Sequence, residues 1–143
     1  MHASILLTKL PKIEQYIQRR REIAALYNEL LSDTDLILPQ EAEYGRHAYY
    51  LYVVRHARRD EILARLRENN IFVNISYPWP IHTMTGYQYL GWQEGSLPET
   101  EAAAKEIFSL PMYPSLTNVE VKRVSDVLHC ILNSSQVNST HVR

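Results

Sequence analysis

The residues best suited to chemistry gather in one stretch, 74–98, which is NISYPWPIHTMTGYQYLGWQEGSLP. It holds both tryptophans of the chain and places His82 among aromatic side chains. Pro78 and Pro80 restrict the backbone around Tyr77 and His82, and a restricted backbone positions polar groups with little further loss of entropy. A histidine could transfer a proton, but one histidine without a partner is not an active site. The stretch predicts a binding surface; the alternative is that its rings merely pack at the edge of a small core.

Other kinds of chemistry find little support in the residue types. The six histidines never lie three to five residues apart, which is the spacing of helical metal ligands, so no metal site is predicted. Cys130 lies beside an apolar stripe without a basic partner, and we interpret it as a structural thiol. The four glycines form no phosphate-binding loop, and no serine stands in a nucleophile elbow. Tyr77 and His82 remain the candidate residues, with no catalytic group assigned.

Composition narrows the class of protein. A length of 143 residues fits one domain. Lys and Arg number 15 against 16 Asp and Glu, so the chain lacks the positive excess that dominates binding to nucleic acid. No apolar run approaches the roughly 18 residues that would cross a membrane, and a single cysteine fits a reducing compartment. We expect a cytoplasmic protein that binds neither nucleic acid nor membranes.

The candidate residues need a scaffold, and hydrophobic periodicity predicts one. Apolar side chains recur at three- and four-residue steps from 11 to 31, which indicates a long amphipathic helix. Aromatic and β-branched residues predict three strands, at 47–54, at 71–75 and within 107–114 up to Pro111. Further helices are predicted at 58–69 and after two capping-box pairs, Ser96 with Glu99 and Thr117 with Glu120. The fold class is α+β: a small antiparallel sheet of about three strands packed with helices, preceded by a long N-terminal helix.

Two apolar segments have no predicted element of this fold to pack against. Residues 3–10 form an apolar leader before the long helix, and the strand at 47–54 is apolar on both faces. Both indicate a partner surface outside these residues. The charge run Arg19–Arg21 is either a solvated helix face or an anion contact. The last residues, 133–143, lack periodicity and are interpreted as a disordered tail.

Seven segments of the chain resemble segments in the C-terminal part of the sugar-nucleotide aminotransferases of DegT/StrS type, and they occur in the same order along the chain. The most specific are YPWPIH and SLPMYPSLT, at 77–82 and 109–117. The others are ASILLTKLPKIEQYIQRRREIAALYNELL, HAYYLYVVR, RRDEILARLRENNI, YQYLG and GSLPETE. The resemblance covers residues 3 to 132. It implies that 11–132 form the C-terminal small domain of such an enzyme, with 1–10 as a remnant of the large domain.

The resemblance implies a function as well as a fold. Members of that family have the aspartate-aminotransferase fold and use pyridoxal phosphate to move an amino group from an amino acid to a nucleotide-linked keto-sugar. Their large domain carries the cofactor site and its lysine, and none of the four lysines here has that context. The chain is therefore expected to bind no cofactor by itself and to be inactive alone, with its partner either the missing large domain or a second copy.

Tyr77 and His82 match positions of the family motif that face the substrate. The resemblance therefore implies that these two residues bind the nucleotide sugar. Two positions depart from the pattern of many members. Asn70 replaces a glycine and can adopt the same left-handed backbone, whereas Ser76 replaces a histidine near the substrate and leaves the identity of the sugar open. The alternative function is a free-standing, non-catalytic domain that binds a partner or a sugar nucleotide.

Overall fold

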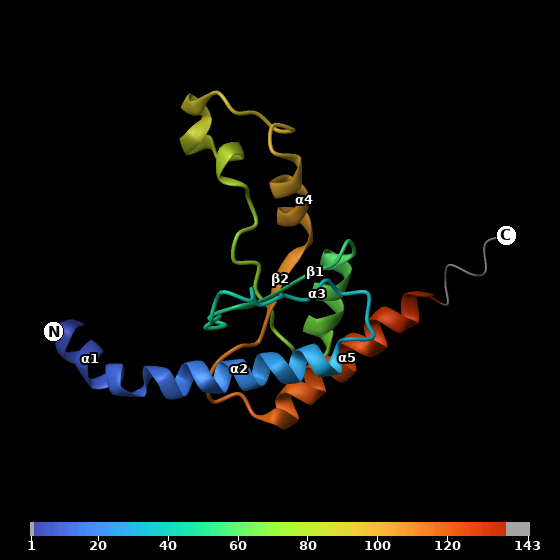
Figure 1. Ribbon diagram of the computed structural model, residues 1–143. Coiled ribbons are helices and arrows are strands. Elements are labelled where there is room, and N and C mark those ends of the chain that lie inside the picture. The colour runs from blue at the N-terminus through green and yellow to red at the C-terminus, as the bar shows by residue number, and fades with distance from the viewer. Residues whose placement is uncertain (1, 137–143) are drawn as a thin grey trace.

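The computed structural model describes residues 2–136. Two long helices, α2 (Ile13–Leu30) and α5 (Asn118–Gln136), pack against each other beneath a small sheet. A third helix, α3 (Arg59–Glu68), packs on α5. From the sheet an extended segment rises away from the two long helices and returns through α4 (Pro98–Glu106) (Figure 1). The architecture is α+β, as the sequence predicts.

The N-terminal apolar leader is helical. Helix α1 (His2–Lys9) continues through a 3₁₀ turn, η1 (Leu10–Lys12), into α2, and the three form one bent rod in Figure 1. Pro11 lies inside the 3₁₀ turn, where its missing N–H disturbs least. The leader is therefore an extension of the long helix, and its apolar side chains remain exposed.

The core lies between the sheet and the three helices. Tyr27 of α2 is fully buried, and its ring lies 5.0 Å from that of Tyr52 on the first strand. Its hydroxyl donates a hydrogen bond of 3.2 Å to the carbonyl of Pro111, and burial raises the pKa of Tyr27. The other fully buried large side chains surround this pair: Ile23, Leu31, Val54, Ile62, Leu66, Phe108, Val121 and Leu128.

The sheet has two strands rather than about three. Strand β1 (Tyr52–Arg55) pairs antiparallel with β2 (Ile107–Leu110). The predicted strand at 71–75 makes only one bridge, in which Asn74 exchanges hydrogen bonds with Ser109. The next hydrogen-bonded pair of that ladder would need an N–H from Pro111, which has none. The strand is therefore not extended in that direction.

The first predicted strand begins later than its composition suggests. Residues 47–51 are not part of β1, because Tyr49 has a φ of 45°, in the left-handed region that breaks an extended backbone. The predicted left-handed backbone at Asn70 is confirmed, with a φ of 58°.

The two predicted capping boxes have different outcomes. Before α5, the backbone N–H of Thr117 donates to Glu120 at 2.8 Å and that of Glu120 donates back to the Thr117 hydroxyl at 3.3 Å. Before α4, Ser96 makes no cap, and its hydroxyl accepts a hydrogen bond from the N–H of Gln93.

At the C-terminus, α5 continues to Gln136, into the segment assigned to a disordered tail at 133–143. The rest of that tail lies outside the described residues. Cys130 lies on α5 but is exposed, so it does not pack as an internal thiol. Across residues 2–136, every helix is too short or too polar to span a lipid bilayer.

Candidate functional site

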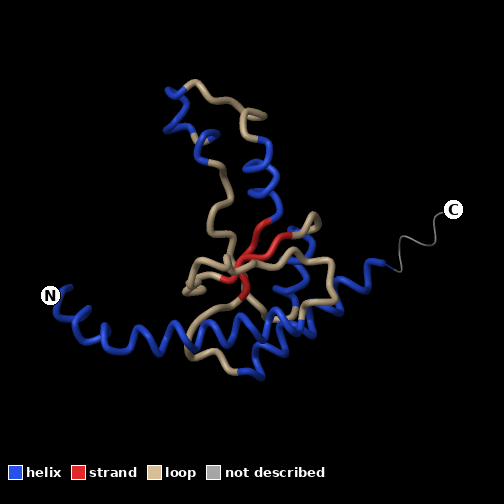
Figure 2. The backbone as a smooth tube through the Cα atoms, in the orientation of Figure 1, coloured by secondary structure: helices blue, strands red, loops and turns tan. Residues whose placement is uncertain are grey.

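The stretch singled out by its residue types forms a projecting arm, here defined as residues 76–97. Figure 2 shows it as loop interrupted by short helical turns, η2 (Ile81–Thr83) and η3 (Thr85–Leu90), well away from the core. Its large apolar side chains are exposed: Tyr77, Trp79, Ile81, Tyr87, Tyr89, Leu90, Trp92 and Leu97. The interpretation that these rings plug the edge of a core is therefore wrong for this part of the molecule. The aromatic side chains of the arm instead form part of the surface of the described residues.

His82 is the exception on this exposed arm. Its side chain is only 7% exposed, and its Nε2 lies 2.8 Å from the Oε1 atom of Glu101 on α4. The sequence interpretation held His82 in place by Pro78 and Pro80 and found no partner for it. The structure provides that partner from a helix 19 residues further along the chain.

Glu101 links His82 to the C-terminal end of the arm. Besides His82, its carboxylate accepts hydrogen bonds from the backbone N–H of Gly95, at 2.8 and 2.9 Å, and from that of Leu97, at 3.3 Å. These bonds, with His82 first, lower the pKa of Glu101. A stable carboxylate thus fixes the histidine and the turn before α4 in one cluster.

Tyr77 behaves differently from His82. Its side chain is 71% exposed, on the rising limb of the arm. Among the described residues no hydrogen bond or ring contact joins it to His82. The structure therefore places the two candidate residues on one arm, with one ring free on the surface and the other held inward.

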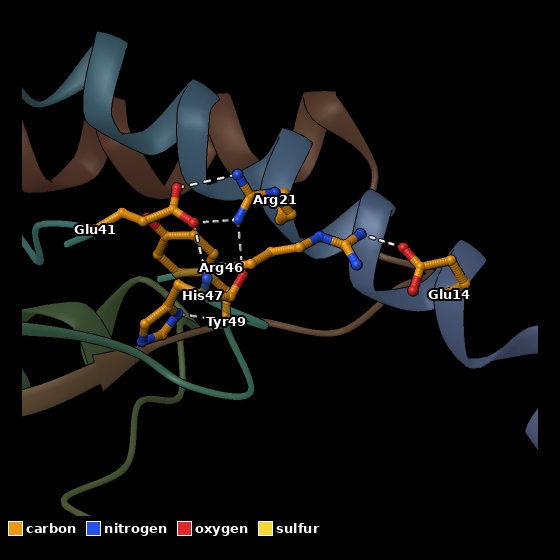
Figure 3. A network of polar contacts seen from close by, with 6 residues as sticks. All are labelled: Glu14, Arg21, Glu41, Arg46, His47 and Tyr49. Atoms are coloured by element: carbon orange, nitrogen blue, oxygen red, sulfur yellow. Dashed lines mark hydrogen bonds and ion pairs between the residues drawn. The ribbon is translucent and has the colours of Figure 1, made fainter. Parts of the chain in front are cut away.

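A second polar cluster lies where α2 meets the loop before β1. Figure 3 shows Arg21 of α2 paired with both carboxylate oxygens of Glu41, while Arg21 also donates to the carbonyl of His47 at 3.0 Å. The N–H of His47 donates to Glu41 at 2.7 Å. These bonds, with Arg21 first, lower the pKa of Glu41 to about 2. Arg21 is therefore engaged within the chain and is not free for an external anion.

The same cluster holds a strained turn. The N–H of Tyr49 donates to Nδ1 of His47 at 2.9 Å, and the two rings lie 4.2 Å apart (Figure 3). Tyr49, with its positive φ, is buried, whereas the next residue, Tyr50, is 75% exposed. The strained turn thus directs one tyrosine into the core and the next outward.

Tyr50 points to an apolar groove along the N-terminal rod. We define the apolar groove by Leu6, Leu7, Leu10, Ile13, Tyr16, Tyr50 and Pro114, which line it together with polar residues, most of them on α2. One of these is Arg20, whose Nε atom is buried without a hydrogen-bond partner among the described residues. An exposed apolar groove that contains a buried donor without a hydrogen-bond partner is typical of a protein–protein interface.

The lysines do not fit a pyridoxal-phosphate site. Such a site needs an amine enclosed beside the cofactor and an acid near the pyridinium nitrogen. All four lysines of the chain are exposed, and they lie on separate elements: Lys9, Lys12, Lys105 and Lys122. Within residues 2–136 there is also no group of three or more histidine, cysteine or acidic side chains that could hold a metal ion.

Comparison with known proteins gives the family. Residues 1–129 match the DegT/DnrJ/EryC1/StrS aminotransferase family, and the chain belongs to it. It is 47% identical over 137 residues to a dTDP-3-amino-3,4,6-trideoxy-alpha-D-glucose transaminase from Micromonospora megalomicea subsp. nigra, covering 92% of this chain and 37% of that protein. A dTDP-3-amino-3,6-dideoxy-alpha-D-galactopyranose transaminase from Aneurinibacillus thermoaerophilus is 36% identical over 90% of this chain and 35% of its own.

The fold matches as well. The crystal structure of DesV from S. venezuelae, in complex with a ketimine intermediate, aligns with a TM-score of 0.85 at 32% identity, over 88% of this chain and 34% of DesV. The family is pyridoxal-phosphate dependent. These 143 residues span about a third of the length of the curated relatives that they match.

Proposed function

We propose that these residues form the substrate-facing part of a pyridoxal-phosphate-dependent aminotransferase that acts on a nucleotide-linked keto-sugar, with an amino acid as the amino donor. The observation that supports this most directly is the 47% identity to a dTDP-sugar transaminase over 92% of the chain. Because the lysines do not fit a cofactor site, the part described here does not transaminate by itself. The setting of such a biosynthetic enzyme is the cytoplasm.

In this proposal Tyr77 and His82 bind the nucleotide sugar. Tyr77 offers an exposed phenol, and His82 offers a ring already fixed by Glu101, so little entropy is lost when a ligand meets them. Exposed rings such as Trp79 can cover apolar parts of a sugar or a base. The two residues form the substrate-binding half of the site. The cofactor and its lysine belong to the large domain.

The cover for the exposed surfaces is the remaining two thirds of the enzyme. The apolar groove and the aromatic arm are both uncovered here, and relatives of this family are about three times as long as the matched region. Self-association of this chain is the second way to cover the groove. A free-standing, non-catalytic binding domain is the alternative function, favoured only by the lysine positions.

A reconstitution experiment tests the proposal. The chain is incubated with pyridoxal phosphate, glutamate and a panel of dTDP-keto-sugars, first alone and then fused behind the unmatched part of the Micromonospora relative. We expect turnover only in the fusion. Turnover by the chain alone, with a lysine–cofactor adduct trapped by borohydride, would contradict the proposed division of the site. A fusion that binds cofactor and sugar nucleotide but never turns over would favour the non-catalytic alternative.

The roles of Tyr77 and His82 are tested in the same fusion. Replacing either by alanine should slow the half-reaction with the sugar nucleotide and spare the half-reaction with glutamate, because the cofactor lies in the other part. Equal losses in both half-reactions would argue against a substrate-binding role. Tyr44→Ala, at a fully solvated position of the body, is the control.

A further inference from the structure

The bond between Glu101 and His82 determines which ring nitrogen carries a proton. An ionised carboxylate only accepts hydrogen bonds, so the nitrogen that faces it must donate. Glu101 remains ionised at neutral pH, since its bonds to His82, Gly95 and Leu97 lower its pKa. At 2.8 Å, the Nε2 atom of His82 is the donor. A neutral His82 therefore carries its lone pair on Nδ1.

His82 differs in this respect from two other histidines of the chain. The Nδ1 atoms of His47 and His56 each accept a hydrogen bond from a backbone N–H two residues further on, at 2.9 Å in both cases. His56 is occupied on both sides, because its Nε2 also lies 3.1 Å from Asp35. Among the described residues no hydrogen bond to Nδ1 of His82 is found. This nitrogen therefore has no hydrogen-bond partner within residues 2–136.

We propose that Glu101 is a positioning residue that holds His82 as the Nε2–H tautomer, so that Nδ1 accepts a hydrogen bond from a hydroxyl or amino group of the bound sugar nucleotide. The inference rests on the proposed function for the identity of the ligand. The tautomer itself depends only on residues of this chain. A fixed carboxylate behind the ring is a common way to orient a histidine and choose its tautomer.

Glu101 also explains why the ring does not turn away. The carboxylate is anchored by the two N–H groups of Gly95 and Leu97, which belong to the returning limb of the arm. Glu101, Gly95 and Leu97, which orient His82, do not belong to the buried core cluster.

The tautomer can be measured on the chain as it exists. Long-range ¹H–¹⁵N spectra of the imidazoles distinguish a protonated ring nitrogen from one with a lone pair. They are recorded well above the ordinary histidine pKa of about 6.5. The His82→Gln variant identifies the His82 signals by their loss. We expect wild-type His82 to show protonated Nε2 and unprotonated Nδ1. Protonation on Nδ1 would overturn the proposal without any Glu101 variant.

Two variants separate positioning from a general effect of charge. Glu101→Gln and Glu101→Ala should shift the His82 signals towards a mixture of tautomers. Glu99→Gln removes the same charge from the first turn of α4, at a side chain that makes no hydrogen bond or ion pair among the described residues, and should leave the signals unchanged. Equal effects of Glu99→Gln and Glu101→Gln, or no effect of either Glu101 variant, would refute the assignment.

In the reconstituted fusion, Glu101→Gln should raise KM for the sugar nucleotide roughly 2- to 10-fold, the weight of one neutral hydrogen bond, and leave KM for glutamate unchanged. An unchanged KM for the sugar nucleotide would refute the contact from Nδ1. If the fusion binds no sugar nucleotide at all, the proposed function fails while the tautomer result stands by itself.

Discussion

Covering the apolar groove should contribute much of the affinity between this chain and whatever completes it. The double variant Leu6→Gln, Leu10→Gln tests this, because the two side chains are 65% and 60% exposed. Fully burying a leucine contributes about 1.5–3 kcal/mol, so covering the exposed fractions of both contributes about 2–4 kcal/mol. Since 1.4 kcal/mol is a tenfold change, the variant should weaken association roughly 30- to 700-fold. Leucine and glutamine have similar helix propensities, so the fold itself should be little affected.

Sedimentation velocity over a dilution series measures self-association, and titration with the separately produced remaining part of the Micromonospora relative measures binding to a large domain. Val119→Gln is the matched control, because Val119 is 77% exposed on α5 and does not line the groove. The reasoning would be refuted if the double variant bound the large domain and itself as tightly as the unmodified chain. A loss of helical signal in circular dichroism would show that the variant had disturbed the rod.

Three further predictions concern the cluster, the core and the arm. Because Glu41 has a pKa of about 2 in the fold against an ordinary 4.5, the order of the loop at 41–49 should persist above pH 4.5 and be lost as the pH falls towards 2. Tyrosine fluorescence would follow this loss, and Glu41→Gln should flatten the profile. Tyr27→Phe should lower the free energy of unfolding by about 1 kcal/mol, because the Pro111 carbonyl loses its donor, whereas Tyr44→Phe should change nothing in the same urea titration. His82→Ala should speed amide exchange at Gly95 and Leu97 and leave the thermal midpoint of the body nearly unchanged, since His82 lies outside the core; a large fall in that midpoint would contradict it.

The sequence predicted the helices better than the strands, for a physical reason. Helical periodicity is local, so 58–69 and the Thr117–Glu120 cap are recognisable from neighbouring residues. Strand extent depends on the partner. On one side the ladder at Asn74 stops because Pro111, far along the chain, lacks an N–H. Strand β1 starts late because the charged cluster around Arg21 and Glu41 supports the strained Tyr49.

For the candidate site, too, the sequence predicted what is local and missed a partner that lies far along the chain. The residue types and the family resemblance pointed to Tyr77 and His82, and both lie on one arm. Glu101 was missed as a partner because nothing in the local pattern links positions so far apart, although it lies within GSLPETE, one of the segments that carry the resemblance. The predicted capping pair, Ser96 with Glu99, marked the start of α4 correctly but named the wrong acceptor: Ser96 does not cap the helix, and Glu101 accepts from the backbone N–H groups of Gly95 and Leu97 instead.

If the proposed function holds, the arm keeps the orientation of His82 before a large domain associates with it. Its large apolar side chains are exposed, but one carboxylate, that of Glu101, binds both the His82 side chain and two backbone N–H groups near the end of the arm. Such a closed set of bonds fixes His82 locally, so association with a large domain would not have to order that ring. Tyr77, which lacks such a bond among the described residues, would be ordered only on binding. This difference predicts that His82 contributes to sugar-nucleotide binding through a preformed contact. Tyr77 is predicted to contribute contact area to the same binding, but at an entropic cost.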